Sequence, residues 1–153
     1  MEIRPDLARF LAGPVLMTLG TRDGGNRPMI ARGSGAWASG DRSLVRVLIS
    51  EWLWPETAAN LRDNGRLALT VVQPADYRAF QLKGFARLRP AAEEEVARAV
   101  RYVETTRALL LGFGVPAALT DHWLCDREVV TAELAPEQVF EQTPGPRAGA
   151  ALG

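Results

Sequence analysis

The sequence predicts a mainly β (α+β) fold, a small antiparallel barrel of five or six strands with covering helices. The prediction rests on short strand-like segments joined by tight turns, one short helix between them, and one long amphipathic helix. A barrel suits such strands because it leaves no long exposed edge. An open sheet packed on a helix has the same periodicity and remains the alternative.

The first half of the chain predicts one helix followed by three strands. Residues 5–12 place Leu7, Phe10 and Leu11 on one helical face, and Gly13-Pro14 ends the helix. The next segments are apolar or alternating, and the residues between them tolerate tight turns. The strands are expected at 15–21, 27–37 and 44–50, with turns at 23–26 and 39–42.

The second half predicts a short helix, further strands and the long helix. Pro55 opens the short helix and Asn64-Gly65 closes it, because proline is tolerated in the first turn and glycine in a left-handed cap. The long helix is expected at 91–113, with a buried side formed by Val96, Val100, Val103 and Leu110. The remaining strands are expected at 67–72, 77–89 and 127–134, with an extension at 138–142.

Length and composition restrict the class of protein. The 153 residues suit one domain, expected over 1–142, followed by a Pro- and Gly-rich tail at 143–153 without regular structure. Hydrophobic residues make up 47% of the chain, and 18 basic side chains balance 18 acidic ones. Disordered chains are less hydrophobic, and nucleic-acid binders are more basic. We therefore expect a folded domain with no nucleic-acid partner.

Three residues are single occurrences of their type, namely Lys83, His122 and Cys125. One cysteine cannot form an intramolecular disulfide, and with one histidine it cannot complete a four-ligand zinc site, so no metal site is expected. No Gly-x-Ser-x-Gly pattern accompanies His122, and the catalytic residues stay unassigned. Without a signal peptide or an apolar run of about 18 residues, we expect a cytoplasmic protein that does not enter membranes.

Three motifs follow one another in a specific order. They are Thr21-Arg-Asp-Gly-Gly-Asn-Arg-Pro28, Asn60-Leu-Arg-Asp-Asn-Gly-Arg-Leu-Ala-Leu69 and Tyr77-Arg-Ala-Phe-Gln-Leu-Lys-Gly84. In this order they resemble the pyridoxamine 5′-phosphate oxidase-like family of FMN-binding split barrels, over roughly residues 7–140. The resemblance implies a six-stranded antiparallel split β-barrel with covering helices. It also implies a homodimer with one FMN in each of two grooves at the interface.

The function implied by this resemblance is flavin-mediated two-electron transfer on a small-molecule substrate, with FMN as the reactive group. Two other functions on the same scaffold stay open. One is a non-enzymatic module that binds a flavin or haem, for which His122 beside Trp123 would be the haem ligand. The other is a deazaflavin-dependent reductase.

Six polar residues are candidates for cofactor binding. They are Arg32, Ser50, Thr57, Asn60, Gln81 and Lys83. The resemblance places Arg32 where a flavin-contacting arginine lies, and a guanidinium can hold phosphate through two hydrogen bonds. Gln81 and Lys83 share one strand face, where the family contacts the flavin ring and its phosphate arm.

One position departs from the family pattern. Where the oxidases carry an Arg-Lys pair for the phosphate, this chain has Glu56 and Thr57. A carboxylate facing a phosphate at roughly 4 Å costs about 4 kcal/mol at an effective dielectric constant near 20. Either Glu56 points to solvent, or the phosphate is held elsewhere, or FMN is not the ligand.

Overall fold

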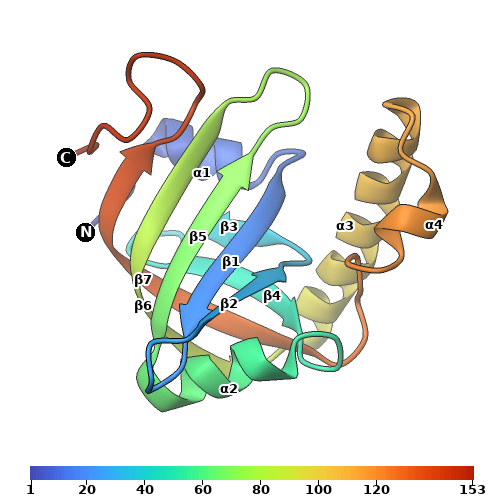
Figure 1. The fold of residues 1–153 in the computed structure, drawn as a ribbon, viewed down its shortest axis with the longest axis horizontal. Coiled ribbons are helices and arrows are strands. Elements are labelled where there is room, and N and C mark those ends of the chain that lie inside the picture. The colour runs from blue at the N-terminus through green and yellow to red at the C-terminus, as the bar shows by residue number, and fades with distance from the viewer.

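The structure, a computed structural model, describes residues 1–153 as a seven-stranded antiparallel sheet curled into a half-barrel, with four helices (Figure 1). The strands are β1 (Leu16–Arg22), β2 (Pro28–Arg32), β3 (Ala36–Ala38), β4 (Val45–Ser50), β5 (Arg66–Val72), β6 (Ala79–Pro90) and β7 (Val129–Glu141). The helices are α1 (Pro5–Leu11), α2 (Pro55–Asn64), α3 (Glu93–Gly112) and α4 (Ala117–Thr120). The predicted mainly β, α+β class is confirmed, and the predicted count of six strands is wrong by one.

The strands lie in the order β2-β1-β5-β6-β7-β4-β3, and every neighbouring pair is antiparallel. One face of the sheet encloses the core, and Leu7, Phe10 and Leu11 of α1 are buried in it as predicted. In Figure 1, α2 lies across the lower end of the half-barrel, and α3 with α4 stands at its side. We call the opposite face of the sheet, which does not enclose the core, the outer face.

The segment at 27–37, predicted as one strand, is in fact two strands at opposite edges of the sheet. The chain crosses between the edges at Gly33 and Gly35. A Cβ atom on Gly33 would lie 2.4 Å from the Sδ atom of Met17, and Gly35 has a φ of +141°. The crossing therefore needs glycine for close approach at one position and for a positive φ at the other.

The buried face of helix α3 was predicted correctly at Val103 and Leu110 and wrongly at Val96 and Val100. Its buried residues are Glu95, Ala99, Val103, Thr106 and Leu110, whereas Val96 and Val100 are exposed. The carboxylate of Glu95 forms an ion pair with Arg89 and accepts a hydrogen bond from the buried Thr131. These polar contacts satisfy a charged group inside the protein, so they set a rotation of the helix that hydrophobicity alone does not indicate.

The C-terminal residues fold back along β7. The predicted strand and its extension form one strand of 13 residues, and Ala151 of the tail forms an isolated bridge with Phe140. The amide of Leu152 donates to the carbonyl of Val139 at 2.8 Å, and the Leu152 side chain packs against the core. The tail thus contains no helix or strand, as predicted, but covers part of the β7 edge.

No helix of the chain is long and apolar enough to span a membrane.

Candidate functional site

A row of polar side chains crosses the outer face of the sheet on β2, β1, β5 and β6. It consists of Arg32, Thr18, Thr70 and Gln81, each directly opposite the next in the strand register. Arg32 Nη1 donates to Thr18 Oγ1 at 3.1 Å, and Gln81 Nε2 donates to Thr70 Oγ1 at 3.0 Å. We call these four residues the polar row. Two of the predicted site residues, Arg32 and Gln81, therefore share one face and one line.

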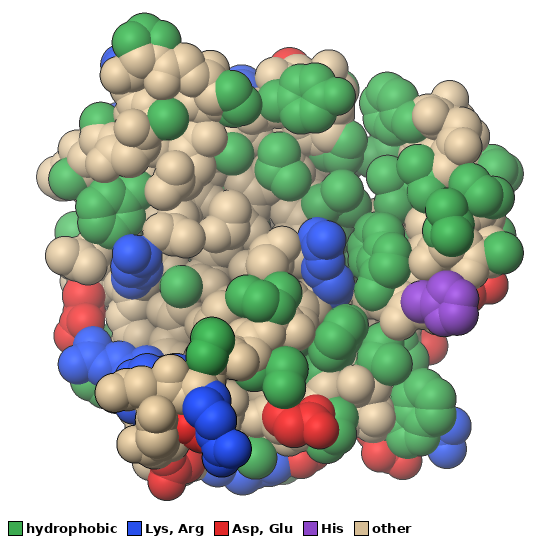
Figure 2. Space-filling model, in the orientation of Figure 1, with side chains coloured by type: hydrophobic (Ala, Val, Ile, Leu, Met, Phe, Trp, Pro, Cys, Tyr) green, Lys and Arg blue, Asp and Glu red, His purple; other side chains and the backbone are tan.

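A groove of about 480 Å³ lies beside the polar row. Its floor includes Gly20 and Ala68, which are opposite each other on β1 and β5, and Arg22, Arg66 and Lys83 stand around it. We call these five residues the cationic groove. In Figure 2, which has the orientation of Figure 1, blue Lys and Arg side chains lie to the left, to the right and below a hollowed, mostly tan area of this face.

The cationic groove carries an excess of positive charge. Lys83 and Arg22 form no ion pair, and Lys83 Nζ lies 5.1 Å from the centroid of the Phe140 ring. Arg66 forms an ion pair with Glu137 at 3.2 Å. Three cations and one carboxylate leave a positive surface over small residues, where an anion can approach the strands closely.

Three predicted site residues lie elsewhere, near α2. Ser50 is fully buried, and its hydroxyl donates to the carbonyl of Arg127 at 2.6 Å. Thr57 is also fully buried, and its Oγ1 atom has no hydrogen-bond partner. Asn60 Nδ2 donates to Thr21 Oγ1 at 3.1 Å, and Thr21 lines the cationic groove. Of these three, Asn60 alone contacts a residue that lines the cationic groove, and the contact is made by the buried side chain of Thr21.

The structure removes one objection to an anionic ligand. Glu56 in the first turn of α2 is exposed, forms no ion pair and does not line the cationic groove. Glu56 therefore points to solvent, which is one of the three outcomes that the sequence left open.

The segment around His122 meets the outer face at one residue. His122 is exposed, and the ring of the neighbouring Trp123 lies under the Arg32 guanidinium, 5.1 Å from its centroid. The chain contains no group of three or more His, Cys, Asp or Glu side chains that could hold a metal ion. The contact between Arg32 and Trp123 extends the polar row beyond the sheet to an aromatic ring.

Sequence reasoning missed Arg22 and Arg66. Both residues alternate with buried neighbours on their strands, so the period of two places each on the outer face. Only the pairing of β1, β5 and β6 brings them together with Lys83. If the register of the hairpin between β5 and β6 had been assumed from the sequence, it would have predicted that Arg66 and Lys83 lie close together.

No protein-family model matches the chain, and no curated protein matches its sequence. Solved structures match over most of the chain. An F420 reductase matches with a TM-score of 0.58 and 13% identity over 90% of this chain and 98% of its own. A candidate pyridoxamine 5′-phosphate oxidase from Lactobacillus delbrueckii matches with a TM-score of 0.57 and 14% identity over 91% and 93% of the two chains.

HutZ, a heme storage protein from Vibrio cholerae, matches with a TM-score of 0.52 and 17% identity over 92% of this chain and 95% of its own. At these identities the likeness shows the fold. The chain has the split-barrel fold of pyridoxamine 5′-phosphate oxidase-like proteins, as the three ordered motifs predicted.

Proposed function

We propose that this chain is an FMN-binding oxidoreductase that holds its cofactor on the outer face of the sheet and acts on a small-molecule substrate by two-electron transfer. The observation that carries the proposal is the position of the polar row beside the cationic groove on one face. FMN has a ring edge with hydrogen-bonding atoms at one end and a phosphate dianion at the other. The two parts of the outer face match these two ends.

The dimensions of the face suit an elongated ligand. Strands lie about 4.8 Å apart, so Arg32 and Gln81, three strands apart, are separated by about 14 Å at the backbone. Lys83 lies two residues, or about 7 Å, further along β6. A ligand lying across the polar row can therefore place an anionic end over the cationic groove.

The side chains present fit the chemistry of the cofactor. Arg32 and Gln81 supply N–H donors for the ring, while Arg22, Arg66 and Lys83 neutralise the phosphate. When bound, the flavin supplies hydride or two-electron transfer. The residues of the chain bind the phosphate, orient the ring and hold it against the strands.

A homodimer belongs to the same proposal. Ile30 and Phe85 are 56% and 43% exposed on the two sides of the outer face. Large exposed apolar side chains beside a ligand groove favour cover by another chain. Light scattering of the purified protein should give a dimer mass, and Ile30→Arg should reduce it to that of a monomer. A monomer in the unmodified protein would contradict this part of the proposal.

The names of the structural neighbours supply the competing ligands, deazaflavin F420 and haem. Absorbance titrations of the purified protein with FMN, F420 and haem separate them. We expect FMN to bind in the micromolar range or tighter and to displace the other two. Binding of haem or F420 with no spectral change for FMN would contradict the proposal.

Turnover separates an enzyme from a binding module. Bound FMN that is reduced by a nicotinamide cofactor and reoxidised by a second substrate supports the oxidoreductase. Bound FMN that resists reduction would favour the non-enzymatic alternative.

A further inference from the structure

A second pocket, of about 520 Å³, lies between α3 and the loop that joins α1 to β1. Small-molecule sites commonly have volumes of about 300 to 1,000 Å³. The pocket shares no lining residue with the cationic groove. It is therefore a separate place for a ligand.

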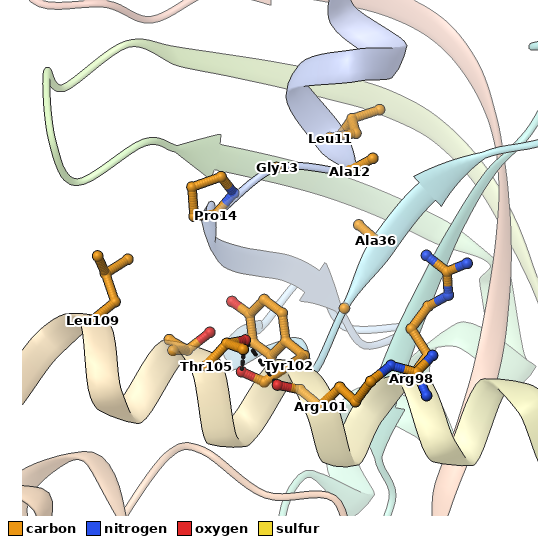
Figure 3. A pocket seen from close by; sticks show the side chains of 12 residues that line it. Leu11, Ala12, Gly13, Pro14, Ala36, Arg98, Arg101, Tyr102, Thr105 and Leu109 are labelled. Atoms are coloured by element: carbon orange, nitrogen blue, oxygen red, sulfur yellow. Dashed lines mark hydrogen bonds between the residues drawn. The ribbon is translucent and has the colours of Figure 1, made fainter.

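The two ends of this pocket differ in chemistry. Figure 3 shows Arg98 and Arg101 at one end and Leu109 at the other, with Tyr102 and Thr105 between them on α3. At a rise of about 1.5 Å per residue, Arg98 and Leu109 lie about 16 Å apart along the helix. The wall facing the helix is largely apolar and includes Leu11, Ala12, Pro14 and Ala36.

The positive end of the pocket has no carboxylate in its own lining, although the same two arginines also line the adjoining groove that contains Glu94 and Glu95. Arg98 and Arg101 form no ion pair, and no acidic side chain lines the pocket. The guanidinium of Arg98 lies over the ring of Trp37, 4.4 Å from its centroid. This contact holds one cation in place while its N–H groups stay free to bind.

The other polar groups along the helix are already engaged. The hydroxyl of Tyr102 donates to the carbonyl of Val15 at 2.7 Å, and burial raises the pKa of this phenol to about 12. Thr105 Oγ1 donates to the carbonyl of Arg101 at 2.7 Å. A ligand in this pocket therefore meets two free cations at one end and mainly apolar contacts at the other.

We propose that this pocket binds a small organic carboxylate with an apolar tail. The carboxylate lies between Arg98 and Arg101, whose guanidinium groups match it in shape and charge. The tail lies along α3 toward Leu109, against Leu11 and Pro14. The site is distinct from the proposed flavin site and does not depend on it.

Titration of the full chain with octanoate, butanoate and octan-1-ol tests the proposal, with no flavin added. Octanoate should bind and shift the amide NMR signals of Gly13 and Gly35, both of which line the pocket. Octan-1-ol has the tail without the charge, and butanoate has the charge with a shorter tail. Each should bind at least about tenfold more weakly than octanoate, a factor that corresponds to about 1.4 kcal/mol.

Arg101→Gln should weaken octanoate binding by about tenfold. Arg87→Gln is the matched control, because Arg87 is an exposed arginine of β6 that forms no ion pair and lines neither pocket. It should leave the affinity unchanged. Equal affinity for octanoate and octan-1-ol, equal effects of the two variants, or no binding of octanoate in the millimolar range would overturn the proposal.

Discussion

Replacing Glu95 by glutamine should destabilise the protein at neutral pH, because this carboxylate joins the start of α3 to the sheet. Arg89 donates to both of its oxygens at 2.8 Å, and the amide of Ala92 and the hydroxyl of Thr131 donate to Oε2, also at 2.8 Å. The hydrogen bonds from Arg89 are the largest cause that lowers the pKa of Glu95, which lies at about 2 against 4.5 for a free glutamate. The network therefore stabilises the ionised form.

The size of the effect follows from this pKa difference. A difference of about 2.5 at about 1.4 kcal/mol for each pKa unit gives about 3.5 kcal/mol. The side chain of Arg89 is 33% exposed, so solvent screens part of the interaction. Glutamine also keeps an acceptor for Thr131. We therefore expect Glu95→Gln to lower the free energy of unfolding by about 2 kcal/mol at pH 7.

The pH dependence has a definite sign. Because folding lowers the pKa of Glu95, its stabilisation is complete above the unfolded value near 4.5 and is lost as the pH falls through about 2. Urea unfolding followed by circular dichroism should show the free energies of unfolding of the unmodified protein and Glu95→Gln converging as the pH falls across this range. Glu93→Gln in the same helical turn is the control, because Glu93 is exposed and forms no ion pair. Equal stability of the two variants at pH 7, or a gap that persists at the lowest pH, would refute the reasoning.

Three further substitutions test the backbone and the buried groups. Gly84→Ala would put a Cβ atom 2.1 Å from the carbonyl oxygen of Ala135. We therefore expect the free energy of unfolding, measured by thermal unfolding, to fall by more than about 3 kcal/mol. An unchanged Tm would contradict the close approach of the two strands at the bulge between Lys83 and Gly84. Ser50→Ala removes a buried hydrogen bond to Arg127 and should cost about 1 kcal/mol while FMN affinity stays unchanged; a large loss of affinity would return Ser50 to the cofactor site. Leu152→Ser should lower the Tm by about 2–4 °C, and no change would mean that the tail does not stabilise β7.

Local signals predicted the elements that depend on local chemistry. Helix α2 begins at Pro55 and ends before Gly65, which has a φ of +68°, as the cap pattern indicated. The alternation in β6 placed Gln81 and Lys83 on one face correctly. These features are visible in the sequence because a few neighbouring residues determine them.

Features that depend on distant contacts were not visible. At the crossing, Gly33 lies so close to Met17 of another strand that a Cβ atom would not fit, and nothing in the segment at 27–37 shows this contact. Ser50 and Thr57 were predicted from their positions in the family pattern, and both are fully buried, because such a match does not indicate which side of an element faces the core. Polarity alone therefore could not separate a buried side chain from a ligand-binding one.

The most direct test of the proposed flavin site compares the affinities of FMN and riboflavin, which differ by the phosphate alone. If the cationic groove holds the phosphate, FMN should bind at least about tenfold more tightly than riboflavin, or about 1.4 kcal/mol. Lys83→Ala should reduce that ratio, because Lys83 is an unpaired cation at the groove. Arg87→Ala removes the same charge from the same strand and should leave the ratio unchanged. Equal affinity for FMN and riboflavin, or equal ratios in the two variants, would contradict a phosphate held in the cationic groove.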